Sequence, residues 1–371
     1  MANLSKITDG AHIYLRPIGF LYGGIAAKAL GEGTARPLAG TGIAFTGLEI
    51  IQRLAGGAID RQLMNVSDWP AWQAALPALQ QARLTAVFAR LQEARPGLDQ
   101  FAGGGKKPPL IMGIVNVTPD SFSDGGRYLE SDVAIAQGAR LVAAGADILD
   151  IGGVSTRPGA EPVPVDEEMS RVLPVVEGLK DLGVPLSVDT TSAAVMREAA
   201  RLGATIINDV SALTAEEMSL AAARDTGAVI VLMHAQGDSR NMQKDPRYDD
   251  VLLDVYDYLE GRVEACQTAG VARGRLALDP GIGFGKTLEH NLALLSGLSL
   301  FHGLGLPLLL GVSRKSFIAR LSGQSDPAAR VPGSLAAQLQ AISQGCQIIR
   351  VHDVAEMAQA KAVFCAIMQA G

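Results

Sequence analysis

The chain has 371 residues, more than one typical domain, with 32 basic and 38 acidic side chains and a formal net charge of −6. This balance excludes a general affinity for nucleic acid or anionic membranes, and no apolar run reaches the length of a membrane span. Three scattered cysteines, Cys266, Cys346 and Cys365, exclude a disulfide framework and a Cys-x-x-Cys zinc site. The N-terminus lacks the pattern of a secretory signal, so we expect a cytoplasmic protein.

Residues 1–102 form the first predicted unit. They contain no internal repeat and no chemical motif, and Trp69–Glu93 has the composition of a helix. We therefore interpret 1–102 as a small extension domain that serves in packing or in dimer formation, and we expect it to be dispensable for chemistry. The next segment, 103–109, reads GGGKKPP, which continues neither a helix nor a strand and is typical of a linker.

Eight short apolar runs follow the linker, and helix-like stretches separate them. The runs cover residues 110–116, 147–152, 185–190, 205–210, 229–234, 275–280, 307–313 and 348–353. The helix-like stretches include 132–144, 166–181, 249–269 and 354–368. Apolar strands that alternate with helices are typical of a parallel sheet covered on both faces. Eight such units in about 260 residues predict an α/β fold, a (β/α)8 TIM barrel over 110–371, rather than a doubly wound sheet with two open edges.

Polar side chains stand at the ends of nearly all these runs. They are Asn116, Asp150, Asp189, Asn208, Asp209, His234, Asp279, Ser313, Arg314, Lys315, Arg350 and His352. Helix capping explains some Asp and Asn residues there, but not an ionisable or amide group after almost every strand. Because the active sites of TIM barrels lie at the carboxyl ends of the strands, this pattern predicts a functional rim.

The motifs around these strand ends resemble those of one enzyme family along the whole predicted barrel. The run GIVNVTPDSFSDGG (Gly113–Gly126) is followed by DIGGVSTRPGA, SVDTT, IINDV, LMHAQG, LDPGIGFGKT, GVSRKSF and IIRVHDV. In order and spacing the set resembles the dihydropteroate synthases. The resemblance implies a transferase of folate biosynthesis and a sulfonamide target, which joins (7,8-dihydropterin-6-yl)methyl diphosphate to 4-aminobenzoate and releases diphosphate. It also implies Mg²⁺ as a cofactor and a homodimer.

By resemblance, the pterin contacts are Asp189, Asn208, Asp279 and Lys315. Their chemistry fits, because a buried carboxylate accepts two parallel N–H bonds from a flat aminopyrimidinone edge and an amide reads the neighbouring donor and acceptor. The Lys315 ammonium is expected to reach a ring oxygen or nitrogen. Two further residues, Met233 and Phe284, either supply apolar faces against the ring or the second substrate or belong to the ordinary core.

The resemblance also places residues around the diphosphate. The expected diphosphate contacts are Thr156, Arg157, Arg350 and His352. Cationic groups of this kind stabilise the negative charge that develops on a leaving diphosphate. Asn116 matches the family's magnesium-binding position, and its amide oxygen suits a hard ion that keeps most of its waters.

The expected catalytic residues are Asp124, Arg157, Lys315 and Arg350. Loops 118–126 and 155–160 are expected to close over the site and exclude water, with Asp124 and Arg157 as partners on closure. Pro158 and Ser316 lie where the family holds the aminobenzoate.

One position departs from the family. Val154 stands where a Glu is usual, which removes a carboxylate that can anchor the closing loop. The run GIGFGKT (Gly281–Thr287) is not an ATP-binding phosphate loop, because the first glycine of that motif would fall at Pro280. The sequence leaves three alternatives open: a pterin-binding barrel acting on another arylamine, a methyltetrahydrofolate-dependent methyltransferase, and a non-catalytic paralogue.

Overall fold

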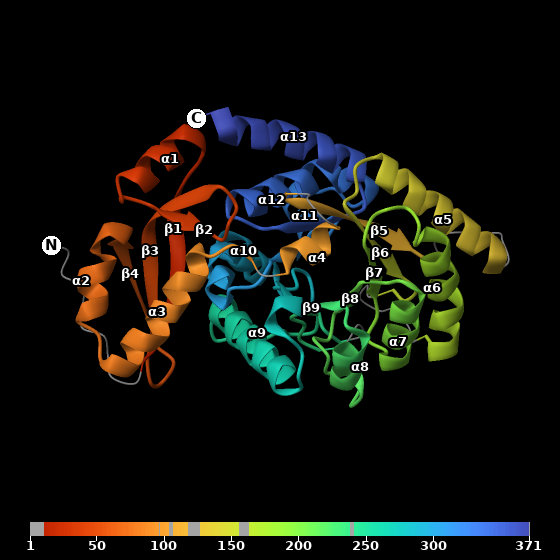
Figure 1. Ribbon diagram of the computed structural model, residues 1–371, viewed down its shortest axis with the longest axis horizontal. Helices are drawn as coiled ribbons and strands as arrows, with labels where there is room; N and C mark the ends of the chain where they lie inside the picture. The colour runs from red at the N-terminus through yellow and green to blue at the C-terminus, as the bar shows by residue number, and fades with distance from the viewer. Residues whose placement is uncertain are drawn as a thin grey trace.

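The structure, a computed structural model, describes residues 11–95, 97–103, 107–117, 127–155, 163–237 and 241–370. These residues form two sheets that lie side by side (Figure 1), a four-stranded antiparallel sheet near the N-terminus and an eight-stranded parallel sheet. No described helix is long and apolar enough to cross a membrane.

The parallel sheet closes into a barrel. Its strands are β5 (Leu110–Asn116), β6 (Ile148–Gly152), β7 (Leu186–Asp189), β8 (Ile206–Asp209), β9 (Val229–Met233), β10 (Leu276–Asp279), β11 (Leu309–Gly311) and β12 (Ile348–Val351). Neighbours pair in the order β10-β9-β8-β7-β6-β5-β12-β11, and a parallel bridge between Leu278 and Leu308 joins the two ends. Each strand expected from the sequence is present, and the (β/α)8 TIM barrel is confirmed.

The barrel strands are apolar because both of their faces are covered. Side chains fill the interior and helices pack on the outside. Every residue of the eight strands is buried except Asn116 and Arg350, which are half-buried. Both exceptions lie at carboxyl ends, where a TIM barrel opens to solvent.

Helices surround the barrel as the sequence predicts. They are α5 (Arg127–Ala143), α6 (Val165–Leu179), α7 (Ala193–Leu202), α8 (Ser219–Thr226), α9 (Val251–Thr268), α10 (Leu288–Ser296), α11 (Ser316–Ser322), α12 (Val331–Ser343) and α13 (Val354–Ala370). A short helix, α4 (Leu98–Ala102), lies at the opposite end from the rim, and its Phe101 shares an apolar cluster with Leu110 and Ile348 at the amino ends of the strands. The chain therefore already packs on the barrel before the glycine-rich segment 103–109.

The N-terminal sheet has an apolar core of its own. Its elements are β1 (His12–Leu21), α1 (Gly23–Gly31), β2 (Arg36–Leu38), β3 (Ile43–Arg53), β4 (Ile59–Asn65), α2 (Trp69–Ala74) and α3 (Ala78–Gln92). Strand β3 is central, with β1 on one side and β2 and β4 on the other. The Trp69 ring stacks on Phe88 of α3 at a centroid distance of 4.1 Å. The helix expected over 69–93 is interrupted before Pro77, because proline restricts the residue that precedes it and cannot continue a helix.

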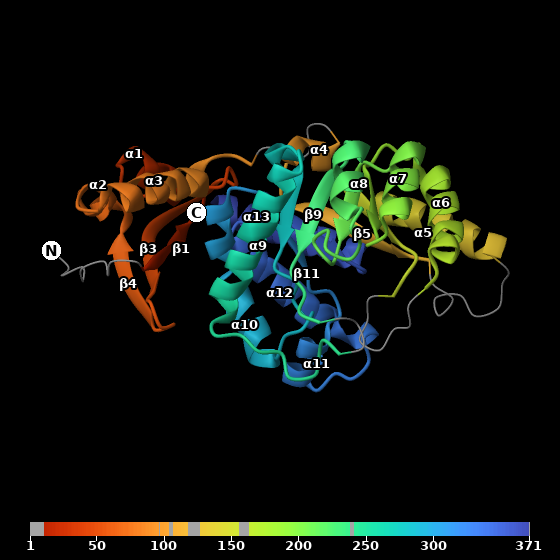
Figure 2. The same ribbon diagram turned by 90° about the horizontal axis from the view of Figure 1, so that it is seen from below.

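The N-terminal sheet lies against one flank of the barrel, beside α9 (Figure 2). Strand β1 also contacts the 3-10 segment η4 (Leu298–Leu304), where the Ser299 hydroxyl donates to the Pro17 carbonyl at 2.9 Å. Arg95, which precedes α4, donates to the carbonyl of the fully buried His302 at 3.3 Å. These buried contacts fix the sheet to the barrel at several points.

Candidate active site

The strand-end residues expected to bind a ligand come together inside the rim of the barrel. Asp189 ends β7 and pairs in register with Asn208 of β8 on one side and Gly152 of β6 on the other. Asp279 ends β10, and Arg350 lies in β12. The parallel register places the side chains of neighbouring strands at the same height, so residues far apart in sequence meet in one place.

Arg350 is the centre of this arrangement. Its Nε donates to Asp150 Oδ2 at 2.6 Å, and its Nη2 donates to Asp189 Oδ2 at 2.7 Å. The Asn208 amide donates to Asp150 Oδ2 at 3.2 Å. Asp150 is fully buried, and its Oδ1 has no hydrogen-bond partner among the described residues. The result is a buried polar network that spans four strands, with Asp150 as its deepest anchor.

Burial tunes the charges in this site. Removal from water raises the pKa of the Asp189 carboxyl to about 7, against the opposing effect of Arg350. Burial also raises the pKa of Asp279, opposed by Lys315, and it lowers the pKa of the Lys315 ammonium to about 8, opposed by Asp279. The site therefore contains an acid and a base whose charges change close to neutral pH, as is common at functional sites.

Lys315 and Phe284 lie together at the rim. The Lys315 ammonium is 4.5 Å from the centroid of the Phe284 ring and donates to the Ile282 carbonyl. Asp279 Oδ1 accepts from the Gly281 amide at 2.7 Å, which fixes the start of the same loop. Phe284 is half-buried, whereas Met233 at the end of β9 is 3% exposed. Of the two residues with open alternatives, Phe284 is the one placed to offer a ring face to a ligand.

The remaining expected residues lie around the same rim. His352 follows β12, and its Nδ1 lies 3.0 Å from the Ser313 hydroxyl. Ser316 is exposed at the first position of α11, and Asn116 ends β5. The expected residues Asp124, Thr156, Arg157 and Pro158 lie outside the described residues.

Sequence reasoning missed a buried lysine. Lys286 is 1% exposed and donates to His234 Nδ1 at 2.9 Å, to the His234 carbonyl at 3.3 Å and to the Phe284 carbonyl at 2.9 Å. Burial lowers the pKa of Lys286, and together with Lys286 it lowers the pKa of His234 to about 3. His234 thus serves the loop as an acceptor. The signal was present in GIGFGKT, where the lysine had been considered only as part of a phosphate loop.

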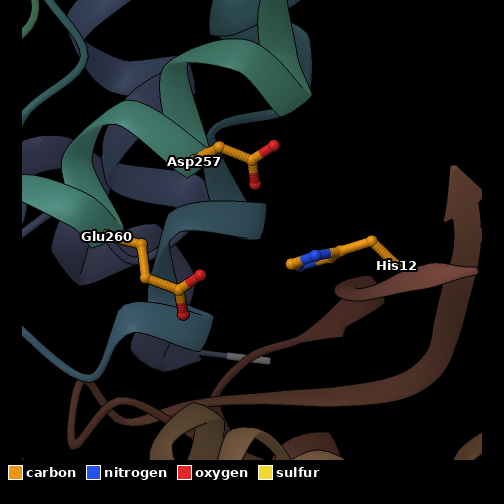
Figure 3. A group of neighbouring side chains, drawn as sticks. All are labelled: His12, Asp257 and Glu260. Carbon is orange, nitrogen blue, oxygen red and sulfur yellow. The ribbon is translucent and has the colours of Figure 1, made fainter. Parts of the chain in front are cut away.

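One group of His and carboxylate side chains within metal-binding distance occurs among the described residues: His12, Asp257 and Glu260. It lies between β1 and α9, where His12 faces the two acidic side chains (Figure 3), and not at the rim. Arg53 donates to Asp257 at 3.0 Å, and Arg83 contacts His12. Two guanidinium groups already neutralise this cluster, so we assign it no metal.

A cavity of about 200 Å³ lies away from the rim. Its lining includes Tyr22 of the N-terminal unit, Pro109 before β5, Cys346 before β12 and Met368 of α13. Pro109 and Cys346 precede β5 and β12, so the cavity lies at the amino ends of these strands. We do not assign chemistry to this cavity, because active sites of TIM barrels lie at the opposite ends.

Comparison with known proteins finds relatives of the barrel. A family model described as "Pterin binding enzyme" matches residues 112–352. The dihydropteroate synthase of Escherichia coli strain K12 is 49% identical over 263 residues, which are 71% of this chain and 93% of that protein. The structure of Yersinia pestis dihydropteroate synthase with a sulfonamide drug has a TM-score of 0.67 at 49% identity, covering 70% of this chain and 94% of that one.

A second similar structure has a bound ligand. It is the dihydropteroate synthase from Xanthomonas albilineans in complex with 7,8-dihydropteroate, with a TM-score of 0.64 at 46% identity. The alignment covers 70% of this chain and 94% of that one. The family model begins at Met112, so the whole N-terminal unit lies outside the matched region.

Proposed function

The chain belongs to the dihydropteroate synthase family of pterin-binding enzymes, and from this premise we propose which of its residues perform the reaction. The enzyme joins (7,8-dihydropterin-6-yl)methyl diphosphate to 4-aminobenzoate and releases diphosphate. The observation that carries the assignment is the buried network in which Arg350 pairs with Asp150 and Asp189. This network adds little to the stability of the barrel, because desolvation of buried ion pairs offsets most of their attraction. Its presence therefore favours a role in binding.

The pterin is proposed to bind over the carboxyl ends of β7, β8 and β10. Arg350 holds one oxygen of Asp189, and the Gly281 amide holds one oxygen of Asp279. Each carboxylate keeps a second oxygen to accept N–H bonds from the aminopyrimidinone edge, and the Asn208 side-chain oxygen is a third acceptor. The Lys315 ammonium has N–H donors beyond the one directed at Ile282, and these suit a ring oxygen or nitrogen.

The diphosphate is proposed to lie beside Arg350 and His352. The guanidinium of Arg350 has five N–H donors and uses only Nε and Nη2 in the described contacts. The His352 ring, whose Nδ1 lies 3.0 Å from the Ser313 hydroxyl, is the second proposed contact to a phosphate oxygen. Thr156 and Arg157 complete this set in the proposal. As the C–O bond breaks, the electron pair leaves with the diphosphate, and nearby cations stabilise that charge.

Asn116 is the proposed contact to Mg²⁺. It ends β5, it is one of the two half-buried residues of the barrel strands, and its side-chain amide has no hydrogen-bond partner among the described residues. A single amide oxygen at an open strand end fits Mg²⁺, which binds few protein ligands and keeps waters and substrate phosphate oxygens. When bound, the ion would neutralise charge on the leaving diphosphate.

The second half of the reaction forms the C–N bond. The aminobenzoate nitrogen attacks the pterin methylene carbon and then loses one proton. Pro158 and Ser316 are proposed to hold this substrate, and Asp124 and Arg157 are proposed to act when the loops close. We further propose a cytoplasmic homodimer, as expected from the sequence and the family.

A steady-state assay of the full chain tests the proposal. Purified protein is incubated with the pterin diphosphate, 4-aminobenzoate and Mg²⁺, and the release of diphosphate is followed together with the formation of 7,8-dihydropteroate. Both products are expected in equal amounts, and Asp279→Ala is expected to lose both. Diphosphate release without dihydropteroate, or neither product from a folded chain, would contradict the proposed function.

A further inference from the structure

The N-terminal unit contacts the barrel through arginines that meet an acidic face of α9. Arg61 of β4 pairs with Asp250 at 2.7 Å. Arg53 of β3 pairs with Asp254 at 2.5 Å and with Asp257 at 3.0 Å. The Asp257 carboxylate also accepts from the Tyr14 hydroxyl of β1, at 2.9 Å to Oδ1 and 2.8 Å to Oδ2. Arg53 and Asp254 are partly shielded from water, so their pair is stronger than an exposed one, whereas Arg61 is exposed and its partner Asp250 is half-buried.

Two of the three acidic partners, Asp250 and Asp254, organise the start of α9. Asp250 is the N-cap of the helix, and its Oδ1 accepts from the amides of Leu252 and Leu253 at 3.0 and 3.1 Å. Asp254 Oδ2 accepts from the amides of Asp249 and Asp250 at 2.9 and 3.3 Å. Arg53 and Arg61 therefore bind the carboxylates that stabilise the N-terminus of α9.

The segment just before α9 packs on the loop that follows β10. The Tyr248 hydroxyl donates to the Gly285 carbonyl at 2.7 Å, and the Gln243 amide donates to the Gly283 carbonyl at 2.8 Å. Gly285 fits closely, because a Cβ there would meet the Gln236 carbonyl at 2.2 Å. Gln236 in turn exchanges two hydrogen bonds with the backbone of Arg247, each of 3.0 Å. The loop and the segment thus form one packed unit.

This loop forms part of the proposed pterin site at the rim of the barrel. Phe284 lies between the two glycines whose carbonyls are held, and its ring lies beside Lys315. The Lys315 ammonium also donates to the Ile282 carbonyl of the same loop. A shift of the loop would therefore move both the ring face and the ammonium that the pterin is proposed to meet.

We propose that the N-terminal unit positions the pterin-binding loop 281–287, with Arg53, Arg61 and Tyr248 as positioning residues. The contacts run from β3 and β4 to Asp250 and Asp254 at the start of α9. Asp254 holds the backbone of Asp249 and Asp250, and Tyr248, the preceding residue, bonds to Gly285 beside Phe284. The unit acts by holding this chain of contacts in one arrangement, which keeps the site preorganised for the ring. The inference rests on the proposed function for the identity of the ligand. It differs from the expectation that residues 1–102 are dispensable for chemistry, which took no account of contacts across the two units.

The charges at this interface favour a structural contact over a metal site. His12, Asp257 and Glu260 face one another there (Figure 3), but Arg53 and Arg83 lie among them. Burial and the two arginines lower the pKa of His12, although Asp257 opposes them. A neutral histidine between arginines and carboxylates suits a fixed contact between strand β1 and helix α9.

The test uses four variants of the full chain, three single substitutions and the double variant Arg61→Ala/Tyr248→Phe. Arg61→Ala removes the pair with Asp250 and a longer one of 3.4 Å with Glu49 of β3, and Tyr248→Phe removes only the hydroxyl that reaches Gly285. Arg36→Ala is the matched control, because Arg36 lies in the same sheet and, within the described part of the chain, bonds only to the carbonyls of Gly33 and Ala35. For each variant, calorimetry gives the Kd for 6-hydroxymethyl-7,8-dihydropterin, steady-state kinetics gives KM and kcat, and thermal unfolding gives Tm.

The proposal predicts a selective loss of pterin binding. Arg61→Ala and Tyr248→Phe should each raise Kd and the KM for the pterin diphosphate by roughly three- to tenfold, with kcat within about twofold. The double variant should lose little more than either single one, because both changes break the same chain of contacts. Arg36→Ala should match the wild type in all three measurements.

Two results would overturn the proposal. One is wild-type Kd and KM in both variants while Tm falls, which would make the contacts purely stabilising. The other is a double variant whose loss is the product of the two single losses, which would make the residues independent. A wild-type chain that binds no pterin at all would instead contradict the proposed function, so the two failures are distinguishable.

Discussion

Arg350 and Asp189 form an ion pair of 2.7 Å inside the rim, between strands that are separated by β5 and β6 in the barrel order. The same guanidinium holds Asp150, so one cation organises two buried carboxylates. Arg350 is thus placed both to fix a pterin acceptor and to meet the leaving group. Its two roles can be separated by experiment.

Arg350→Ala is predicted to damage turnover far more than binding of a pterin without diphosphate. Charge grows on the departing oxygen only as the bond breaks, so loss of the cation should lower kcat/KM on the order of a hundredfold. The Kd for the bare pterin should rise by about tenfold, since Asp189 loses a partner. Kinetics and calorimetry on the same variant supply the two numbers. Equal losses in both would restrict Arg350 to ring binding.

The pH dependence of pterin affinity should follow Asp189 and Lys315. Asp189 must be ionised to accept N–H bonds, and its pKa is raised to about 7 by burial, so affinity should fall below about pH 7. Lys315 must be protonated to donate, and its pKa is lowered to about 8, so affinity should also fall above about pH 8. A plot of Kd against pH measures both limbs. Lys315→Gln should remove the alkaline limb, and an unchanged limb in that variant would assign it to another group.

The raised pKa of Asp189 also predicts the direction in which the free energy of unfolding changes with pH. Its pKa in the folded chain is above the ordinary value of 3.8, so the folded state binds more protons than the unfolded state between about pH 4 and pH 7. The free energy of unfolding from this group should therefore fall as pH rises through that window. Urea unfolding of the wild type and of Asp189→Asn measures the difference, which should shrink toward low pH. A difference that grows toward low pH would mean that Arg350 outweighs burial.

Lys286→Met should loosen the loop after β10. The substitution leaves the His234 and Phe284 carbonyls and His234 Nδ1 without their buried donor, at a cost of about 1–3 kcal/mol for each unmet buried group. Urea unfolding should show the lower stability, and calorimetry should show weaker pterin binding, because Phe284 lies in this loop. A Lys286→Met variant with the free energy of unfolding of the wild type would mean that the ammonium makes no net contribution to stability.

The fold and the main site residues follow from local sequence patterns. Eight apolar runs predict eight parallel strands, and polar residues that end those runs predict the rim, which is how Asp189, Asn208 and Asp279 are found. The pairing of Asp150 with Arg350 could not be predicted in this way. Its partner Arg350 is 200 positions away, and the pairing exists only because β12 closes beside β5.

The departure at Val154 has a structural setting that the sequence does not show. Val154 is half-buried, and the next residue inward, Gly153, lies against the side chain of Glu168 from α6, 3.5 Å from where a Cβ would stand. Glu168 is buried, its Oε1 has no hydrogen-bond partner among the described residues, and burial raises its pKa. A buried carboxyl group therefore exists close to the position where the family's Glu is replaced. The ion pairs between the N-terminal unit and α9 could not be predicted from the sequence either, because paired charges on two surfaces have no periodic pattern.

The central claim is that the strand-end network binds the pterin ring, and calorimetry on Asp189→Asn tests it most directly. The substitution keeps the shape of the side chain and one oxygen that can accept from Arg350, but it removes the charge. The account predicts a folded protein whose Kd for 6-hydroxymethyl-7,8-dihydropterin is roughly ten- to a hundredfold weaker than that of the wild type. A folded variant with wild-type Kd would contradict the account, because the pterin would then have to bind elsewhere.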